Sequence, residues 1–310
     1  MTNTSCPFAF FEGKIIPTEE AKVSIMTNAL QYGTGIFSGM RGYYNADSKT
    51  LNVFRMDDHI ERFLESLKIL GVSIKYSHEE LKKIVTDLVI KNKPETDVYF
   101  RPFAYAGSLN LAPNLDRDSV FEFALYMIPM GDYLPTNKGL SVGVSAWERI
   151  SDNAIPSRAK ISGGYINSAL AKKDAHLQGF DEAIFLNSSG HVAEGSAMNI
   201  FLVRRGKLIT PAVSEDILEG ITRRSIMQIA SDMKIEVTER AVDKSELYIA
   251  DEVFFSGTAA QIAWINKVDG RTVGTGEQGD VSKKIQEVFF NIVRGKDAKY
   301  SEWLTEVRIS

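Results

Sequence analysis

The sequence predicts a two-domain protein, with an α+β first half and a second half in which strands and helices alternate. At 310 residues the chain can bury a sizeable core and falls in the usual size range of two domains. Two prolines and a glycine interrupt the hydrophobic periodicity between residues 129 and 135. We therefore expect a small N-terminal α/β domain over 1–128, an interdomain loop over 129–138 and a larger C-terminal domain over 139–310.

Two amphipathic helices are predicted in the first half, among β-type runs at 51–55, 98–105 and 121–128. The first begins at Asp57 and ends before Gly71, and its apolar residues recur every three or four positions: Ile60, Phe63, Leu64, Leu67 and Leu70. The second begins with a capping box at 77–80, which is followed by Leu81, Ile84, Val85 and Leu88.

The second half alternates between the two kinds of element. Strands are predicted at 140–146, 182–186, 199–203 and 252–255, and helices at 166–178, 221–233 and 281–293. Gly179 and Gly295 end two of the helices, and Arg205-Gly206 is expected to form a hairpin turn.

Composition argues against several classes of partner. A formal net charge of -4 and a pI near 5.7 give no whole-chain field that would attract phosphate backbones, so nucleic acid is not expected. The start of the chain lacks a basic n-region, and no apolar run approaches the ~20 residues that span a bilayer. The single cysteine, Cys6, fits a reducing cytosol, so we expect a cytoplasmic protein. The four histidines show no metal-ligand spacing, and no metal is expected.

A lysine with small neighbours is the first candidate functional residue. Lys160 follows a strand and precedes Ser162, Gly163 and Gly164, which would let a bulky ring approach the backbone. Most lysines are solvated surface charges. A buried lysine, however, loses its proton readily and becomes a nucleophile that can form a Schiff base with an aldehyde cofactor.

Tyr165 and Glu194 complete the set of residues that a pyridoxal phosphate enzyme needs. A carboxylate against the pyridine nitrogen keeps that nitrogen protonated, so that the ring accepts electrons from a carbanion. The tyrosine hydroxyl can hydrogen-bond the ring oxygen. Taken alone, Glu194 could equally be an acid at the end of a strand, and Tyr165 could be a core tyrosine.

Two segments and one arginine are candidates for binding a phosphate. Ile221 and Thr222 stand at the start of a predicted helix, where free N–H groups and the helix dipole favour an anion. The turn at 256–260 follows a strand and can also present N–H groups. Arg55 could add a fixed positive charge. The alternatives are ordinary helix capping by Thr222 and a solvated surface arginine.

Tyr99 and Arg101 alternate on a predicted strand and so project from the same face. They could offer a hydroxyl and a bidentate guanidinium to a substrate carboxylate, although a half-buried strand would show the same pattern. The interdomain loop carries Met130 and Tyr133, which fit either a packed crossover or a lid over a site. The glycines at 274–279 match the dinucleotide fingerprint, but too little chain follows for a βαβ unit, and we expect a loop.

With these motifs together, the chain resembles the branched-chain amino acid aminotransferases, which are fold type IV, D-amino acid aminotransferase-like enzymes. The resemblance runs from Phe-Glu-Gly at 11–13, through Tyr-Gly-Thr-Gly-Ile-Phe at 32–37, to Asp-Glu-Val-Phe at 251–254 and the last helix. It implies a small N-terminal α/β domain, a larger C-terminal pseudo-barrel domain, and at least a homodimer with the site at the subunit interface. The implied activity is a transaminase that moves the amino group between leucine, isoleucine or valine and 2-oxoglutarate.

The resemblance also implies a role for each site residue. Lys160 would form the Schiff base with pyridoxal 5'-phosphate and later move the proton at the substrate Cα, while Glu194 would pair with the pyridine nitrogen and Tyr165 with the ring oxygen. The phosphate would be held by Arg55, Ile221, Thr222 and Thr258, and the α-carboxylate by Tyr99, Thr258 and Ala259. The distal carboxylate of glutamate would be held by Arg101, Tyr133 and Tyr32 of the partner subunit, and aliphatic side chains by Phe37, Gly39, Met130 and Tyr165.

The chain departs from the family pattern at several positions. Residues 37–41 read Phe-Ser-Gly-Met-Arg where Phe-Glu-Gly-Ile-Arg is expected, and residues 160–165 read Lys-Ile-Ser-Gly-Gly-Tyr where Lys-x-Gly-Gly-Asn-Tyr is expected. Met130 stands where many bacterial relatives carry tryptophan, and methionine leaves a softer, roomier wall. We therefore predict broadened specificity that extends toward aromatic amino acids or some primary amines.

Other functions remain open at this point. Within the same fold they are a D-amino acid aminotransferase, an (R)-amine transaminase and an aminodeoxychorismate lyase, and the Tyr99-x-Arg101 pattern favours the L-branched-chain type. A dinucleotide-binding oxidoreductase would depend on the glycines at 274–279. A catalytically inactive binding protein would have no need to retain Lys160, Glu194 and Tyr165 together.

Overall fold

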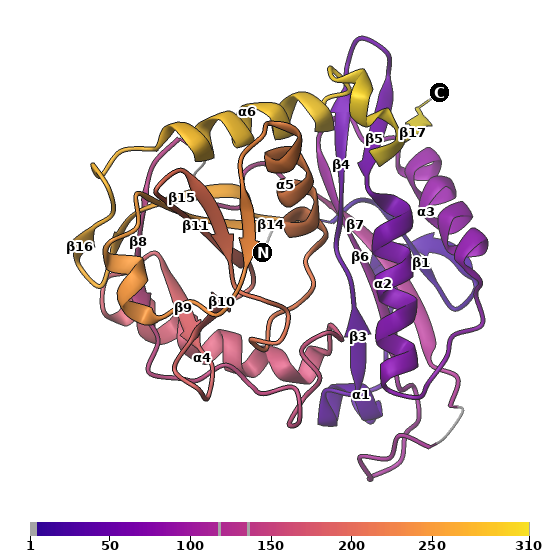
Figure 1. Ribbon diagram of the computed structural model, residues 1–310. Helices are drawn as coiled ribbons and strands as arrows, with labels where there is room; N and C mark the ends of the chain where they lie inside the picture. The colour runs from indigo at the N-terminus through magenta and orange to yellow at the C-terminus, as the bar shows by residue number, and fades with distance from the viewer. Residues whose placement is uncertain (1–4, 117–118, 135–136, 310) are drawn as a thin grey trace. The chain divides into compact units, whose positions relative to one another are not determined.

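The computed structural model describes residues 5–116, 119–134 and 137–309 (Figure 1). Pro135 and Thr136 of the predicted interdomain loop lie outside these residues, as do residues 1–4. The chain forms two compact units, the first of Met1–Gly131, Ala159–Gly163 and Asn291–Ser310, and the second of Asp132–Arg158 and Gly164–Phe290. Each unit is built around its own sheet.

Among the described residues, the first unit holds an antiparallel sheet of eight strands in the order β17-β5-β4-β6-β7-β1-β2, with β3 paired to β6. The longest pairing, β6 with β7, runs from Val98 opposite Pro129 to Tyr105 opposite Glu122. The strands are β1 (Phe8–Phe11), β2 (Lys14–Pro17), β3 (Gly35–Phe37), β4 (Met40–Asn45), β5 (Thr50–Phe54), β6 (Val98–Tyr105), β7 (Glu122–Pro129) and β17 (Leu304–Arg308).

The two helices predicted for the first half are confirmed as α2 (Met56–Ile69) and α3 (His78–Asn92). The capping box of α3 is present, because the Ser77 hydroxyl accepts the Glu80 N–H while the Glu80 carboxylate accepts the Ser77 N–H. The first unit also holds the short helix α1 (Asn28–Tyr32), the 3₁₀ turns η1 (Thr18–Glu20) and η4 (Ala298–Trp303), and the first two residues of the 3₁₀ turn η2 (Ser162–Gly164).

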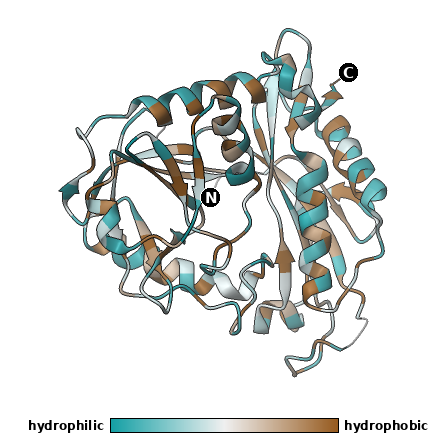
Figure 2. Ribbon diagram, in the orientation of Figure 1, coloured by the Kyte–Doolittle hydropathy of each residue, from teal (hydrophilic) through white to brown (hydrophobic). Residues whose placement is uncertain are grey.

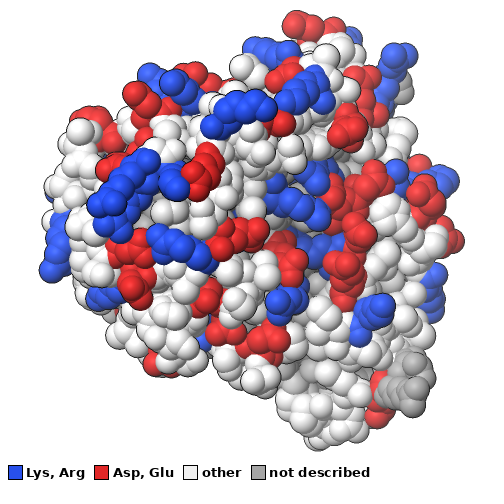
Figure 3. All heavy atoms as spheres, in the orientation of Figure 1, with Lys and Arg blue, Asp and Glu red and all other residues white. Residues whose placement is uncertain are grey.

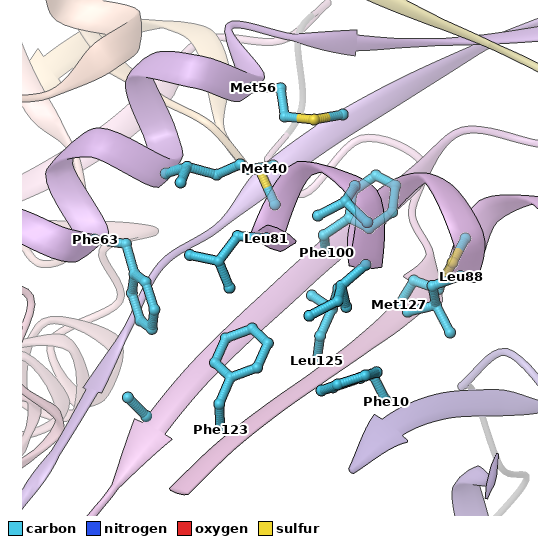
Figure 4. Packing of buried hydrophobic residues seen from close by; sticks show 14 of the residues in the cluster. Phe10, Met40, Met56, Phe63, Leu81, Leu88, Phe100, Phe123, Leu125 and Met127 are labelled. Atoms are coloured by element: carbon cyan, nitrogen blue, oxygen red, sulfur yellow. The ribbon is translucent and has the colours of Figure 1, made fainter. Parts of the chain in front are cut away.

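Apolar side chains from α2, α3 and the sheet form the core of the first unit. Both helices carry hydrophobic and hydrophilic residues along their length (Figure 2). Figure 4 shows Phe63 of α2 and Leu81 of α3 packed with Phe100, Phe123 and Leu125 of the sheet, all of them buried. Burial of each such side chain stabilises the fold by about 1.5–3 kcal/mol.

Among the described residues, the second unit holds a mixed sheet of nine strands in the order β10-β9-β8-β15-β14-β11-β12-β13, with β16 paired to β15. Its described helices are α4 (Tyr165–Leu177), α5 (Ile221–Asp232) and all but the last three residues of α6 (Asp280–Val293), with the 3₁₀ turn η3 (Lys244–Tyr248). The strands are β8 (Leu140–Val144), β9 (Glu182–Leu186), β10 (Val192–Gly195), β11 (Asn199–Arg204), β12 (Lys207–Thr210), β13 (Val237–Glu239), β14 (Glu252–Gly257), β15 (Gln261–Val268) and β16 (Arg271–Thr272).

Two turn predictions for the second half are confirmed. Arg205 and Gly206 both have positive φ, 52° and 75°, and join β11 to β12 as a two-residue hairpin. The glycine-rich stretch at 274–279 is a loop between β16 and α6.

The charged surface is mixed in sign. Figure 3 shows acidic and basic side chains interspersed over one face. None of the described helices combines the length and the apolar character needed to cross a membrane.

Candidate active site

Tyr99, Arg101 and Phe37 lie together in the first unit. Arg101 Nη2 donates to Tyr99 Oη over 3.4 Å, and the guanidinium carbon lies 4.6 Å from the centroid of the Phe37 ring. Gly39 leaves the space that the tyrosine needs, because a Cβ at Gly39 would lie 1.8 Å from Tyr99 Oη. Arg101 Nε is buried and has no hydrogen-bond acceptor among the described residues. Such a donor is costly unless a ligand supplies the acceptor.

Lys160 lies in a short segment that pairs with β3. The Phe37 N–H donates to the Lys160 carbonyl over 3.0 Å, and Ile36 forms an antiparallel bridge with Ile161. Lys160 Nζ lies 5.0 Å from the centroid of the Phe37 ring. The predicted nucleophile and the Arg101 guanidinium therefore approach the same aromatic ring.

The residues that follow Lys160 are hydrogen-bonded to the backbone at residues 33–35. Ser162 Oγ lies 3.1 Å from the Gly33 carbonyl oxygen and 3.0 Å from that of Gly35, and the Gly163 N–H donates to Gly33 over 3.1 Å. A Cβ at Gly33 would lie 2.7 Å from Gly163 Cα. These small residues thus allow two backbones to touch. Tyr32, at the end of α1 just before this contact, is 40% exposed.

Arg55 joins β5 to α2 in a left-handed conformation, with φ 52°. Its guanidinium pairs with Asp58, including a 3.0 Å contact from Nη2 to Oδ1, and lies 4.6 Å from the centroid of a Trp303 ring. The Arg55 side chain is only 12% exposed, so the alternative of a solvated surface arginine is wrong.

Arg41 holds the backbone at Met130. Its Nη2 donates to the Met130 carbonyl over 3.1 Å and to the Gly131 carbonyl over 2.8 Å, while the Met130 N–H donates to the Asp97 carbonyl over 2.9 Å. Arg41 is 2% exposed. Buried charge-assisted bonds of this kind fix the start of the interdomain loop.

Glu194 lies in the second unit, where Arg149, Asn199 and Leu218 contact its carboxylate. Arg149 Nη2 is 2.9 Å from Oε1, the Asn199 side-chain amide donates to Oε2 over 3.0 Å, and the Leu218 N–H donates to Oε2 over 3.4 Å. The Glu194 side chain is 7% exposed. Its partners compensate the cost of taking a carboxylate out of water.

The N-cap position of α5 provides no side-chain hydrogen bond to the free N–H groups of the helix start. The residue before the first turn is Gly220, which has no side chain to cap with, and Thr222 is buried inside that turn. The alternative of capping by Thr222 is therefore wrong. A Cβ at Gly220 would lie 1.9 Å from Asn199 Oδ1. The helix start can therefore accept an anion.

The turn at 258–260 closes the hairpin between β14 and β15, with Gly257 opposite Gln261. Asn199 lies opposite Ser256 on the neighbouring strand. The same asparagine that holds Glu194 therefore lies between the α5 start and the strand that leads to Thr258.

Tyr165 is the first residue of α4, and the Tyr133 side chain is tied to the same helix. Tyr133 Oη accepts a hydrogen bond from Lys172 Nζ over 3.3 Å. Lys172 in turn forms a 3.0 Å ion pair with Glu182.

The predicted site residues divide between the two units. The first unit brings together Phe37, Gly39, Tyr99, Arg101 and Lys160 and also holds Tyr32, Arg55 and Met130; the second holds Tyr133, Tyr165, Glu194, Ile221, Thr222, Thr258 and Ala259. Sequence reasoning gave no role to four residues that support them: Arg41, Arg149, Lys172 and Asn199. A polar residue at the head of the apolar strand 199–203 is a signal that could have singled out Asn199.

Comparison with known proteins identifies the family and the fold. The family described as amino-transferase class IV matches residues 35–268. A probable branched-chain-amino-acid aminotransferase of Aquifex aeolicus (strain VF5) is 49% identical over 304 residues, which cover 98% of this chain and 97% of that protein.

Two solved structures are equally similar in fold. The branched-chain aminotransferase from Thermoproteus uzoniensis with norvaline has a TM-score of 0.93 and 42% identity, covering 97% of this chain and 99% of its own. The T.th. branched-chain amino acid aminotransferase complexed with N-(5'-phosphopyridoxyl)-L-glutamate has a TM-score of 0.93 and 38% identity, covering 98% and 99%. The predicted fold class is thereby confirmed, and the chain belongs to the branched-chain-amino-acid aminotransferases of class IV.

Proposed function

We propose that the protein is a pyridoxal 5'-phosphate-dependent transaminase that moves the amino group between leucine, isoleucine or valine and 2-oxoglutarate. The observation that carries the proposal is the buried Glu194 carboxylate, which Asn199 ties to the segment before the uncapped start of α5. A carboxylate can pair with a pyridine nitrogen, and a free helix start can bind a phosphate. The pyridine nitrogen and the phosphate are at two ends of one cofactor, pyridoxal phosphate.

The residues of the chain fit this cofactor. Gly220 has no side chain with which to cap the helix, so that the N–H groups of Ile221 and Thr222 can reach a phosphate, with Thr258 and Arg55 as further ligands. Glu194 would pair with the ring nitrogen and Tyr165 with the ring oxygen. When bound, the cofactor supplies an aldehyde that condenses with amines and a ring that withdraws electrons from the substrate Cα. The phosphopyridoxyl-glutamate bound by the T.th. enzyme supports the same chemistry here.

Lys160 would hold the cofactor between turnovers and move a proton to and from the substrate Cα. Its backbone is fixed by the Phe37 N–H, and the Phe37 ring 5.0 Å away favours a cation at Nζ. Proton transfer by a side chain placed in this way contributes roughly 10²–10⁴ to the rate.

One pocket must accept an aliphatic side chain in one half-reaction and a carboxylate in the other. We assign the α-carboxylate to Tyr99 and to the backbone of Thr258 and Ala259. Arg101 and Tyr133 would receive the distal carboxylate, and the buried Arg101 Nε supplies a donor that lacks an acceptor among the described residues. When an aliphatic group is bound instead, the Phe37 and Tyr99 rings near the guanidinium reduce the cost of its charge.

Met130 supports a wider range of donors than leucine, isoleucine and valine. A methionine wall adapts its shape to the group that it contacts, and the Arg41 bonds fix only the backbone at this position. We expect activity toward aromatic amino acids or some primary amines in addition to the branched-chain amino acids.

We further propose a cytoplasmic homodimer in which Tyr32 of the partner subunit completes the site. The first unit has an apolar cavity of about 440 Å³ whose lining includes Val23 and Leu30. Both of these residues are exposed, as are Ile25 and Met26 beside them. A second copy of the chain would cover this apolar surface.

Absorption spectra test the proposal. The wild-type protein loaded with pyridoxal phosphate should absorb as a lysine-bound cofactor and lose that band when L-leucine is added, whereas Lys160→Ala should not gain it. Lys173→Ala changes an exposed lysine and should behave as wild type. A wild-type protein that stays colourless with added cofactor ends the proposal.

The alternative activities give different products. Assays with L-leucine, D-amino acids and (R)-amines separate the transaminases by the enantiomer that they consume. Pyruvate release from aminodeoxychorismate without a keto-acid acceptor would identify a lyase instead.

A further inference from the structure

Lys172 links a buried carboxylate to the hydroxyl of Tyr133. Its Nζ lies 3.0 Å from Glu182 Oε2, 3.3 Å from Tyr133 Oη and 5.2 Å from the centroid of the Tyr133 ring. The Glu182 side chain is 0% exposed, and its Oε1 accepts the Ala183 N–H over 2.9 Å. The ammonium therefore compensates a carboxylate that water does not reach.

The ammonium of Lys172 decides which way the Tyr133 proton points. Burial acts to lower the pKa of Lys172, but Glu182 and Tyr133 oppose it, and the pKa is raised overall. A lysine ammonium has three donors and no acceptor. Tyr133 Oη accepts from it, so the phenol proton is directed elsewhere and can be donated to a second acceptor.

One further contact and one helix spacing describe the place of Tyr133 in the second unit. Its neighbour Asp132 accepts a hydrogen bond over 3.0 Å from Gln261, the residue that ends the turn 258–260. Lys172 follows Tyr165 by seven residues, so both side chains belong to one face of α4, about 10 Å apart along its axis. The Tyr133 hydroxyl is thus bonded to the helix of one proposed cofactor ligand, and the adjacent Asp132 side chain is bonded to the residue that follows the turn of the proposed α-carboxylate ligands.

We propose that Lys172 is a positioning residue for the dicarboxylic substrate. Together with Glu182 it fixes the Tyr133 hydroxyl as a donor to the distal carboxylate of a five-carbon dicarboxylic amino or keto acid. A nearby positive charge strengthens the hydroxyl as a donor, and an aliphatic side chain makes no use of it. This inference depends on the proposed function, in which Tyr133 binds that carboxylate.

Binding of two unreactive acids to the pyridoxal phosphate-loaded protein, measured by calorimetry, tests the inference. Lys172→Met should weaken binding of glutarate about tenfold or more and change binding of 4-methylvalerate by less than about twofold. Lys172→Arg should recover most of the glutarate affinity, because a guanidinium can still pair with Glu182 and donate to Tyr133. The control Lys173→Met alters the adjacent exposed lysine and should match wild type. The KM for 2-oxoglutarate should rise while the KM for leucine stays constant.

Two further variants separate a positioning role from a structural one. Lys172→Met leaves the Glu182 carboxylate buried without its cation. The double variant Lys172→Met/Glu182→Gln removes this unpaired charge and should therefore keep the fold. Its affinity for glutarate should fall to the same extent as that of Lys172→Met. In a Tyr133→Phe background, Lys172→Met should cause no additional loss, since Lys172 acts through the hydroxyl. Equal weakening of both acids, or an additional loss in the Tyr133→Phe background, overturns the inference. A wild-type protein that neither binds these acids nor transaminates leucine overturns the proposed function instead.

Discussion

The side-chain amide of Asn199 donates to Glu194 Oε2 over 3.0 Å and to the Leu218 carbonyl over 2.9 Å. Its Oδ1 occupies the space that a Cβ at Gly220 would need. One buried amide therefore sets the distance between the carboxylate and the start of α5. In the proposed function these are the ligands at opposite ends of the cofactor.

Replacing Asn199 with alanine should weaken cofactor binding. Glu194 loses a hydrogen-bond donor in a buried place, which costs about 1–3 kcal/mol, or a factor of about 5–150 in the dissociation constant. Titration of the apoprotein with pyridoxal phosphate measures this factor. Asn153→Ala, in an exposed turn, is the matched control. An unchanged dissociation constant for Asn199→Ala would show that the amide does not organise the site.

Gly39→Ala should impair the binding of every amino acid substrate, whatever its side chain. The added Cβ would lie 1.8 Å from Tyr99 Oη, so the tyrosine must move away from the position proposed to hold the α-carboxylate. We expect the KM values for leucine and glutamate to rise together, about tenfold or more. A rise confined to one of the two substrates would contradict the assignment of Tyr99 to the α-carboxylate.

Arg41→Met should both destabilise the protein and change its range of amino donors. It removes two charge-assisted hydrogen bonds from the Met130 and Gly131 carbonyls, with an expected loss of about 3 kcal/mol in the free energy of unfolding. The loop that carries Met130 would then be less restrained, and kcat/KM for phenylalanine relative to leucine should rise. Arg41→Lys keeps the charge but not the forked geometry, so we expect an intermediate result. If Arg41→Met leaves the ratio of kcat/KM for phenylalanine and leucine unchanged, the loop that carries Met130 does not select the amino donor.

The sequence was sufficient to predict the five longer helices, although not the five-residue α1, because the signals of a long amphipathic helix are local. The period of apolar residues identified α2 and α3, and the capping box at Ser77 fixed the start of α3 to the residue. Strands β3 and β4 were missed because neither shows an alternating pattern: all three residues of β3 and the first four of β4 are buried. A strand covered on both faces carries no period of two.

The side-chain partners of the site residues could not be predicted, because these contacts are not local in the sequence. The resemblance identified Glu194, but its ion pair with Arg149 joins residues 45 positions apart, and no spacing rule connects them. Residue type was misleading for the alternative role of Thr222. A threonine near a helix start suggests an N-cap, but the N-cap residue of α5 is Gly220. Side-chain partners of a buried charge depend on how distant strands pair, which pattern alone does not specify.

Glu246 should make the stability of the protein depend on pH in the acid range. Hydrogen bonds from Arg240, at 2.7 and 2.6 Å, and a weaker contribution from Arg204 lower the pKa of Glu246 below its usual 4.5, against the opposing effect of burial. Because the folded-state pKa is lowered, the stabilisation is fully present above the unfolded-state pKa and is lost as pH falls through the folded-state value.

Urea unfolding of the wild type and of Glu246→Gln between pH 7 and pH 3 measures this effect as a difference in unfolding free energy. The difference should be largest near neutral pH and shrink as pH falls below about 4.5, because the wild-type carboxylate then takes up a proton and resembles the amide. Glu236→Gln is the control: Glu236 is 60% exposed and pairs with Lys207, so its removal should change stability little at any pH. A constant gap between wild type and Glu246→Gln across this range would mean that the Arg240 pair is not the source of the acid sensitivity.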